Sequence, residues 1–173
     1  GKKNKVGTPQ GGVISPLLAN IYLHLLDRIV NNPKSLFARA GVKIVRYADD
    51  FVMMGKKIEF QIKDKLKELL SRMGLSLNEE KTRMVNAKEE SFDFLGFSIR
   101  YDRSIIGSKP KYWNIIPSRK SEQRLRDKIK DYLDQHGHYC VEQICGDLNL
   151  QLAGWLNYFE IKGVSYPAMS KRR

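Results

Sequence analysis

The feature that most constrains this fold is the stretch from residue 44 to residue 53, IVRYADDFVM, in which two apolar runs flank adjacent aspartates. The runs 44–45 and 51–53 are rich in β-branched and aromatic residues, which is typical of strands. Aspartate tolerates the left-handed backbone of tight turns, so a turn can form here without glycine. We therefore expect a β-hairpin with Asp49 and Asp50 at its turn.

Two neighbouring carboxylates at a hairpin tip repel each other, and a fold gains nothing from that repulsion unless a cation neutralises it. The natural cation is Mg²⁺, which proteins usually hold with one or two carboxylates plus substrate phosphates. The alternative is an ordinary acidic turn, because aspartate is common in surface turns. The rest of the chain must decide between these two interpretations.

The charge balance indicates a polyanionic partner. The chain has 173 residues, which is enough for one domain or two small ones with a core that needs no disulfide. It carries 31 Lys and Arg against 19 Asp and Glu, a net charge of +12. Nucleic acid is favoured over a membrane, because no run approaches ~20 consecutive apolar residues. A structural RNA-binding protein would have the same composition, so charge alone names no reaction.

The two cysteines, Cys140 and Cys145, lie five residues apart in a segment with helical spacing. We interpret them as reduced intracellular thiols. His136 and His138 lie nearby, so zinc binding is an alternative, but the spacing matches no common zinc finger. The chain begins with Gly1 and shows no signal peptide, which we interpret as the cut edge of a longer chain.

The segment before the hairpin predicts a loop followed by a helix. Residues 1–12 are polar, basic and rich in glycine, as in a loop. Ser15 is a good N-cap and Pro16 suits the first helical position. The buried stripe expected on this helix is Leu18, Ile21, Tyr22, Leu25 and Ile29.

The segment after the hairpin predicts another helix and then short strands. Apolar residues recur at helical spacing over 58–73, and Gly74 supplies a stop. Segments 75–77 and 82–85 are short strand candidates, and 92–99 alternates as one firmer strand. This order predicts an α+β fold, in which helices cover one face of a largely antiparallel sheet.

The C-terminal part is predicted to be helical. Around 108–117 the composition turns to Gly, Pro, Lys and Trp, and we expect the strands to stop beyond this stretch, with a boundary near 110–117. A helix capped by Ser118 or Ser121 runs to about 133, and a second spans about 141–159. We therefore divide the chain into residues 1–110 and a small helical domain, 111–173.

Several stretches, taken together and in order, resemble one family. GTPQGGVISPLLANIYLHLLD at 7–27, YADDFV at 47–52 and FLGF at 94–97 resemble the reverse transcriptase encoded by group II introns, also called the intron maturase. GLSLNEEKT at 74–82, PSRKSEQRLR at 117–126 and WLNYF at 155–159 match the same family. Any one stretch is a weak signal, but the ordered set covers nearly the whole chain.

The resemblance implies part of a right-hand polymerase palm over 1–110, an antiparallel sheet with helices on one face, followed by a small helical thumb over 111–173. It implies an RNA-directed DNA polymerase that copies intron RNA into DNA by two-metal nucleotidyl transfer and assists splicing. The implied partners are an RNA template, a DNA primer and dNTPs, with no membrane. The implied location is intracellular, in the bacterial cytoplasm.

The resemblance also assigns roles at the hairpin. Asp49 would bind the catalytic Mg²⁺ ions, with Asp50 as its less critical neighbour. Tyr47 and Ala48 would lie beneath the primer terminus and the new base pair. Lys81 aligns with a lysine that would protonate the leaving pyrophosphate.

Further roles fall outside the hairpin. Gln10 and Gly11 belong to the loop that approaches the incoming nucleotide and template, and Leu95 with Gly96 belongs to the turn that grips the primer. Four basic residues would contact the backbone of the RNA·DNA duplex, although a solvated helix face explains them equally well. They are Arg119, Lys120, Arg124 and Lys128.

The chain departs from the family in one respect. The family's other palm aspartate lies on an earlier strand that would precede residue 1, as would the fingers. The acids Asp27, Asp64, Asp93 and Asp102 do not sit in an equivalent context. We therefore expect this chain alone to have little or no polymerase activity.

Two alternatives to this function remain open. One is a non-catalytic RNA-binding splicing cofactor, which would use the same basic surface. The other is a retron, diversity-generating or CRISPR-associated reverse transcriptase, although the SPLLANIYL and WLNYF stretches argue against it. The intact YADD motif favours polymerase chemistry, because a binding module gains nothing from a repulsive carboxylate pair.

Overall fold

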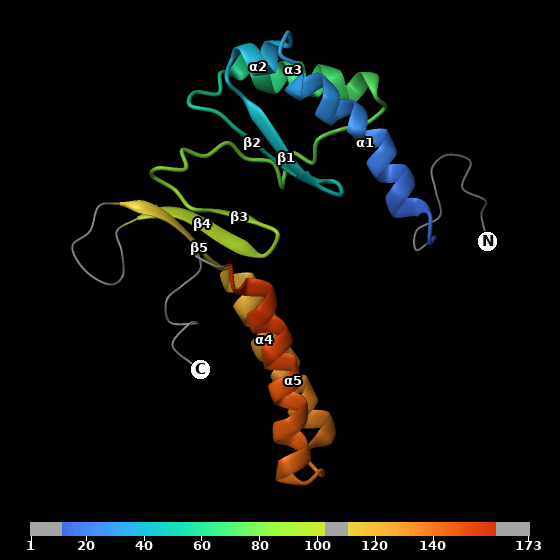
Figure 1. Cartoon of the computed structure of the whole chain (residues 1–173), viewed down its shortest axis with the longest axis vertical. Coiled ribbons are helices and arrows are strands. Elements are labelled where there is room, and N and C mark those ends of the chain that lie inside the picture. Colours follow the sequence, from blue (N-terminus) through green and yellow to red (C-terminus); the bar gives the residue numbers. More distant parts are fainter. Residues whose placement is uncertain (1–11, 103–110, 162–173) are drawn as a thin grey trace. The chain divides into compact units, whose positions relative to one another are not determined.

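The computed structural model describes residues 12–102 and 111–161, and the chain forms two compact units that divide between Arg83 and Met84 (Figure 1). Both units combine helices with an antiparallel sheet. The mixed α and β fold with antiparallel pairing is therefore confirmed. The division into palm and thumb near residue 110 stays a prediction.

The first unit consists of three helices and one hairpin. The helices are α1 (Ser15–Asn31), α2 (Leu36–Arg39) and α3 (Phe60–Arg72). The strands β1 (Lys43–Tyr47) and β2 (Asp50–Met54) pair in antiparallel register from Lys43 opposite Met54 to Tyr47 opposite Asp50. The predicted hairpin at 44–53 is thus present.

One hydrophobic core joins all the elements of the first unit. Ile44 of β1 is buried in it, and Phe51 and Met53 of β2 pack against it. Because strand residues alternate between faces, Ile44 and Arg46 share the core-facing side while Val45 and Tyr47 face outward and are exposed. The helices contribute most of the other buried side chains of this core, namely Leu26, Val30, Phe37, Ile62, Leu66 and Leu70.

Helix α1 differs from its prediction in two respects. Its N-cap is Ile14, and Ser15 is the first helical residue, so Ser15 is not the cap. The fully buried residues are Leu26 and Val30, whereas Ile21 and Leu25 of the predicted stripe are about half exposed or more. The stripe was wrong because apolar residues surround much of this helix, and spacing alone could not select the face that meets the core.

Helix α3 follows its prediction closely. Ile62, Leu66 and Leu70 are buried along one face, as the spacing indicated. Gly74 follows the helix with φ of +68°, and the Leu75 N–H donates to the Leu70 carbonyl at 2.8 Å, which ends the helix. The segments 75–77 and 82–85 are irregular, so their prediction as strands was wrong.

The second unit pairs a three-stranded sheet with two helices. Its strands are β3 (Phe92–Phe94), β4 (Phe97–Asp102) and β5 (Tyr112–Pro117), in the order β3-β4-β5. The predicted single strand over 92–99 is therefore two strands separated by a turn. Strand β5 was missed because Lys111 and Pro117 outweighed the β-forming residues between them.

The two helices of the second unit match their predictions. Helix α4 (Arg119–His136) is capped by Ser118, whose side chain accepts from the Ser121 N–H, and α5 spans Val141–Phe159. The Tyr132 hydroxyl donates to Asp147 at 2.6 Å, which joins the two helices and raises the pKa of Tyr132 to about 12. Within the described ranges no helix is long and apolar enough to cross a membrane.

We predict that Leu26→Ala destabilises the first unit by about 2–5 kcal/mol, because it leaves a cavity in the hydrophobic core of that unit. The Leu26 side chain is fully buried there. The matched control is Ile21→Ala on the same helix, at a residue that is 62% exposed. It should change the free energy of unfolding by less than about 1 kcal/mol, as exposed sites usually do. Urea unfolding of both variants checks this, and equal losses would contradict the assigned core face.

Candidate functional site

The hairpin tip is a two-residue turn made by Ala48 and Asp49. Tyr47 and Asp50 form the last strand pair, so Asp50 is the first residue of β2 rather than part of the turn. Ala48 has φ of +52°. Tight hairpin turns require a positive φ at the first central residue. The left-handed position therefore belongs to Ala48, and the expectation that both aspartates form the turn was wrong.

The tip is open to solvent. Tyr47, Ala48, Asp49 and Asp50 are all exposed, and Tyr47 retains 66% of its accessible surface. Carboxylate oxygens are hard donors that suit Mg²⁺, which takes one or two carboxylates and leaves other positions to water and phosphate. Across residues 12–102 and 111–161 no cluster of three or more His, Cys, Asp or Glu forms a dedicated metal cage. Asp49 and Asp50 together could supply the one or two carboxylates that such a Mg²⁺ site uses.

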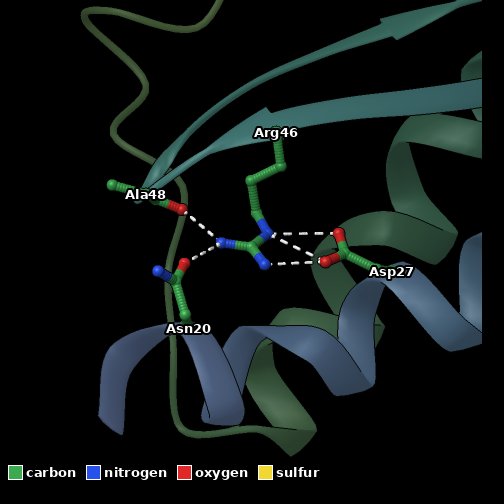
Figure 2. Close-up of polar contacts among 4 residues, drawn as sticks. All are labelled: Asn20, Asp27, Arg46 and Ala48. Atoms are coloured by element: carbon green, nitrogen blue, oxygen red, sulfur yellow. Dashed lines mark hydrogen bonds and ion pairs between the residues drawn. The ribbon is translucent and has the colours of Figure 1, made fainter. Parts of the chain in front are cut away.

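Arg46 fastens this tip to helix α1 (Figure 2). Its Nε donates to both carboxylate oxygens of Asp27 at 3.1 Å, and its Nη2 donates to Asp27 Oδ2 at 2.7 Å. Its Nη1 donates to the Ala48 carbonyl at 2.7 Å and to Asn20 Oδ1 at 3.0 Å. One guanidinium thus bridges two positions of α1 and the turn that carries Asp49.

The environment of Arg46 explains why this contact is specific. The side chains of Arg46 and Asp27 are only 10% and 24% exposed, so the charges are largely withdrawn from water and must be paired. The hydrogen bonds that Arg46 donates to Asp27 raise the pKa of Arg46 and favour its cationic form. A fork of parallel N–H donors onto a carboxylate is the strongest common form of ion pair.

Sequence reasoning missed Arg46 and treated Asp27 as a residue without a site role. A signal was present, because β alternation places Arg46 on the same face as the apolar Ile44. A charged residue at an inward position needs a partner of opposite charge. The sequence did not show that Asp27, nineteen positions earlier, supplies it.

A second tight turn joins β3 and β4. Leu95 and Gly96 both have positive φ, +51° and +83°, and they link the paired residues Phe94 and Phe97. Positive φ at both central positions is the type I′ geometry that matches strand twist. The turn that the resemblance implied at Leu95 and Gly96 is therefore present, and its contact with a primer stays a prediction.

Both helices of the second unit hold this turn. The Gly96 carbonyl accepts from the Ser118 N–H at 2.8 Å and from the Ser121 hydroxyl at 2.9 Å. The Leu95 carbonyl accepts from the Tyr158 hydroxyl at 3.0 Å. The start of α4 and the end of α5 therefore fix the backbone of the turn from two directions.

The other predicted site residues lie on the surface or outside the described ranges. Lys81 is exposed on the irregular segment after α3. Gln10 and Gly11 lie outside the described residues. The basic residues of α4 are all exposed, and three of them recur at every fourth position, which places them on one face. These three are Lys120, Arg124 and Lys128, with Arg119 at the first helical position.

Comparison with known proteins decides the family. Residues 1–99, which contain the whole Asp49 hairpin, match the family described as reverse transcriptase (RNA-dependent DNA polymerase). The chain belongs to the reverse transcriptase family. The resemblance to group II intron-encoded members is also confirmed, because the chain is similar to the group II intron-encoded protein LtrA of Lactococcus lactis subsp. cremoris. The identity is 31%, over 76% of this chain and 32% of LtrA.

Two other relatives extend this comparison. The 91 kDa protein in the cob intron of Schizosaccharomyces pombe is 26% identical over 91% of this chain and 28% of its own length. Protein YkfC of Escherichia coli K12 is 32% identical over 66% of this chain and 38% of its own length. The chain thus spans about a third of the length of the curated relatives it matches.

We predict that Gly96→Ala destabilises the second unit by about 2–3 kcal/mol, more than left-handed strain alone. An added Cβ would lie 2.9 Å from the Ser121 Oγ. The matched control is Gly74→Ala, which has nearly the same φ, +68°, and open space around its Cβ. Gly74→Ala should lower the free energy of unfolding by only about 1 kcal/mol.

The double variant Gly96→Ala with Ser121→Ala removes the crowded hydroxyl. Its loss in free energy of unfolding should be smaller than the sum of the losses of Gly96→Ala alone and Ser121→Ala alone, because both single variants disturb the same contact. Urea unfolding measures all four variants. Strict additivity, or equal losses at Gly96 and Gly74, would contradict the packed turn.

Proposed function

We propose that the protein to which this chain belongs is an RNA-directed DNA polymerase in which Asp49 and Asp50 bind Mg²⁺ at the hairpin tip. The observation that carries the proposal is an exposed carboxylate pair, with Asp49 in a tight turn and Asp50 directly after it, in a chain of the reverse transcriptase family. The reaction joins the primer 3′-oxygen to the α-phosphorus of a dNTP and releases pyrophosphate.

The hairpin residues have distinct roles in this proposal. When bound, two Mg²⁺ ions stabilise the attacking and leaving oxygens of the in-line displacement. Asp49 is the principal carboxylate ligand, and Asp50 assists it. Ala48 is small enough for a duplex end to approach closely, and the exposed Tyr47 ring offers a surface beside it.

In this proposal the second unit contacts the nucleic acid, and Lys81 acts on the leaving pyrophosphate. Leu95 and Gly96 contact the primer, and their backbone is fixed by three hydrogen bonds from α4 and α5. The exposed basic face of α4, with Lys120, Arg124 and Lys128, contacts the phosphate backbone of the duplex. Lys81 protonates the leaving pyrophosphate, and Gln10 with Gly11 approaches the incoming nucleotide.

We also propose that residues 1–173 alone do not polymerise. Two-metal transfer needs more carboxylate oxygens than Asp49 and Asp50 provide, and within the described ranges no third acidic group joins them. The match covers only 32% of the length of LtrA and 28% of the length of the cob intron protein. A further palm carboxylate from elsewhere in the protein completes the site.

A second function, assistance in splicing, uses the RNA-binding surface rather than the carboxylates. The net charge of +12 and the basic face of α4 favour RNA binding. The name of LtrA ties that relative to a group II intron. We propose that both functions coexist in an intracellular protein and depend on different residues.

The test is primer extension on an RNA template by the full-length product of the reading frame that encodes this chain. Asp49→Asn should lower kcat at least about 100-fold, since a metal ligand supplies several kcal/mol of transition-state stabilisation. Asp50→Asn, the matched control, should lose less. RNA binding and splicing assistance should be unchanged in both.

Two results would contradict the proposal. One is full cDNA synthesis by Asp49→Asn. The other is robust Mg²⁺-dependent synthesis by the 173-residue chain alone, which would show that its own carboxylates suffice.

A further inference from the structure

We propose that Arg46 is a positioning residue that sets the orientation of Asp49 by holding the Ala48 carbonyl against helix α1. The inference rests on the proposed function of the Asp49 site. It concerns the Arg46 guanidinium, which is proposed to touch neither the metal nor the substrate. Its basis is the single guanidinium that contacts Asp27, Asn20 and Ala48 together (Figure 2).

The guanidinium has two arms with different tasks. Its Nε and Nη2 side is fixed on Asp27 by three contacts of 2.7–3.1 Å. Its Nη1 reaches the Ala48 carbonyl at 2.7 Å, which is short for an N–H donor and typical of a charge-assisted bond. The Nε and Nη2 atoms anchor Arg46 to Asp27 of α1, and Nη1 links the anchored side chain to the turn.

Holding the Ala48 oxygen constrains Asp49 directly. The Ala48 carbonyl and the Asp49 N–H belong to one planar peptide group. Fixing the oxygen therefore fixes the orientation of that plane, which also contains the Asp49 Cα. The turn needs this support, because Ala48 holds a positive φ of +52° that an L-residue with a Cβ disfavours.

The identity of the residue matters as well as its charge. Arg46 lies on the core-facing side of β1, opposite Phe51 and in line with Ile44. Packing alone would be served better there by an apolar residue, since a buried ion pair adds little net stability. Lysine carries the same charge but lacks the planar fork, so it cannot hold Asp27 and Ala48 at once.

The first experiment uses NMR of the 173-residue chain with Arg46→Lys. We expect the Ala48 carbonyl carbon and the Asp49 amide nitrogen to shift, while the core methyl signals of Leu26 and Leu66 stay in place. The matched control is Arg72→Lys, at an exposed arginine in the last turn of α3. It should leave Ala48 and Asp49 unchanged.

If Arg46→Lys does not fold, Asn20→Ala replaces it. That variant removes only the exposed partner of Nη1 and leaves the Asp27 arm intact. It should shift the signals of the Ala48 carbonyl carbon and the Asp49 amide nitrogen relative to those of the unsubstituted chain. Unchanged signals at Ala48 and Asp49 in a folded variant would overturn the proposal.

The second experiment measures primer extension by the full-length product. Arg46→Lys should lower kcat about 10- to 100-fold, as a misplacement near 1 Å can do. The KM for dNTP should stay within about threefold, because Arg46 contacts no substrate. Combining Asp27→Asn with Arg46→Lys should add little further loss, because the two residues act as one unit.

The outcomes separate the two proposals. If Asp49→Asn abolishes synthesis but Arg46→Lys leaves kcat unchanged, the positioning role is overturned and the proposed function stands. If Asp49→Asn has no effect, the proposed function fails, and the NMR shifts still decide whether Arg46 holds the turn. A kcat loss that tracks only a lower thermal midpoint, with unshifted Ala48 and Asp49 signals, would also overturn the positioning role.

Discussion

The ion pair between Arg46 and Asp27 is the constraint on which the first unit depends. It joins the core-facing side of the hairpin to α1 by contacts as short as 2.7 Å, at a place where most of each side chain is withdrawn from water. Because a withdrawn charge must be paired, neither partner can change alone without cost. The same guanidinium also donates to the Ala48 carbonyl. One side chain therefore anchors the hairpin to α1 and supports the turn that carries Asp49.

The second unit solves a similar problem with neutral groups. There the turn at Leu95 and Gly96 has two positive φ angles, and its carbonyls accept bonds from Ser118, Ser121 and Tyr158. Phe97, directly after the turn, packs against Tyr158 and Phe159 with ring centroids 5.6 and 4.9 Å apart. In the first unit the turn is held by Arg46 of β1, which α1 anchors, whereas in the second unit the turn is held by groups at the start of α4 and the end of α5.

The features predictable from sequence were those encoded by local patterns. The hairpin strands, the amphipathic face of α3, its stop at Gly74 and the Ser118 cap of α4 each depend on residues within a few positions. The errors arose where tertiary contacts decide. The buried face of α1 depends on which apolar side meets the core, and Ala48 holds the left-handed position although Asp49 has the higher preference for it.

The residues of the candidate site likewise fall into those that the sequence predicted and those that only tertiary contacts reveal. The roles of Asp49 and Asp50 were predicted from the resemblance carried by several stretches in order along the chain, and the family match supports that prediction without testing the role of either residue. Arg46, Asn20 and Asp27 were not predicted, because their significance exists only when the hairpin lies beside α1. The motif therefore predicts the metal-binding carboxylates, and it gave no sign of Arg46, whose guanidinium contacts both Asp27 and the turn.

The most direct test of the central claim is paramagnetic line broadening of the 173-residue chain with Mn²⁺ as a probe for the Mg²⁺ site. Amide signals of Ala48, Asp49 and Asp50 should broaden at the lowest Mn²⁺ concentration. The combined Asp49→Asn and Asp50→Asn variant should lose that broadening and keep its other signals. Broadening that begins at other exposed acids such as Glu89 and Glu90, or that persists at the tip in the double variant, would contradict a metal-binding role for the hairpin.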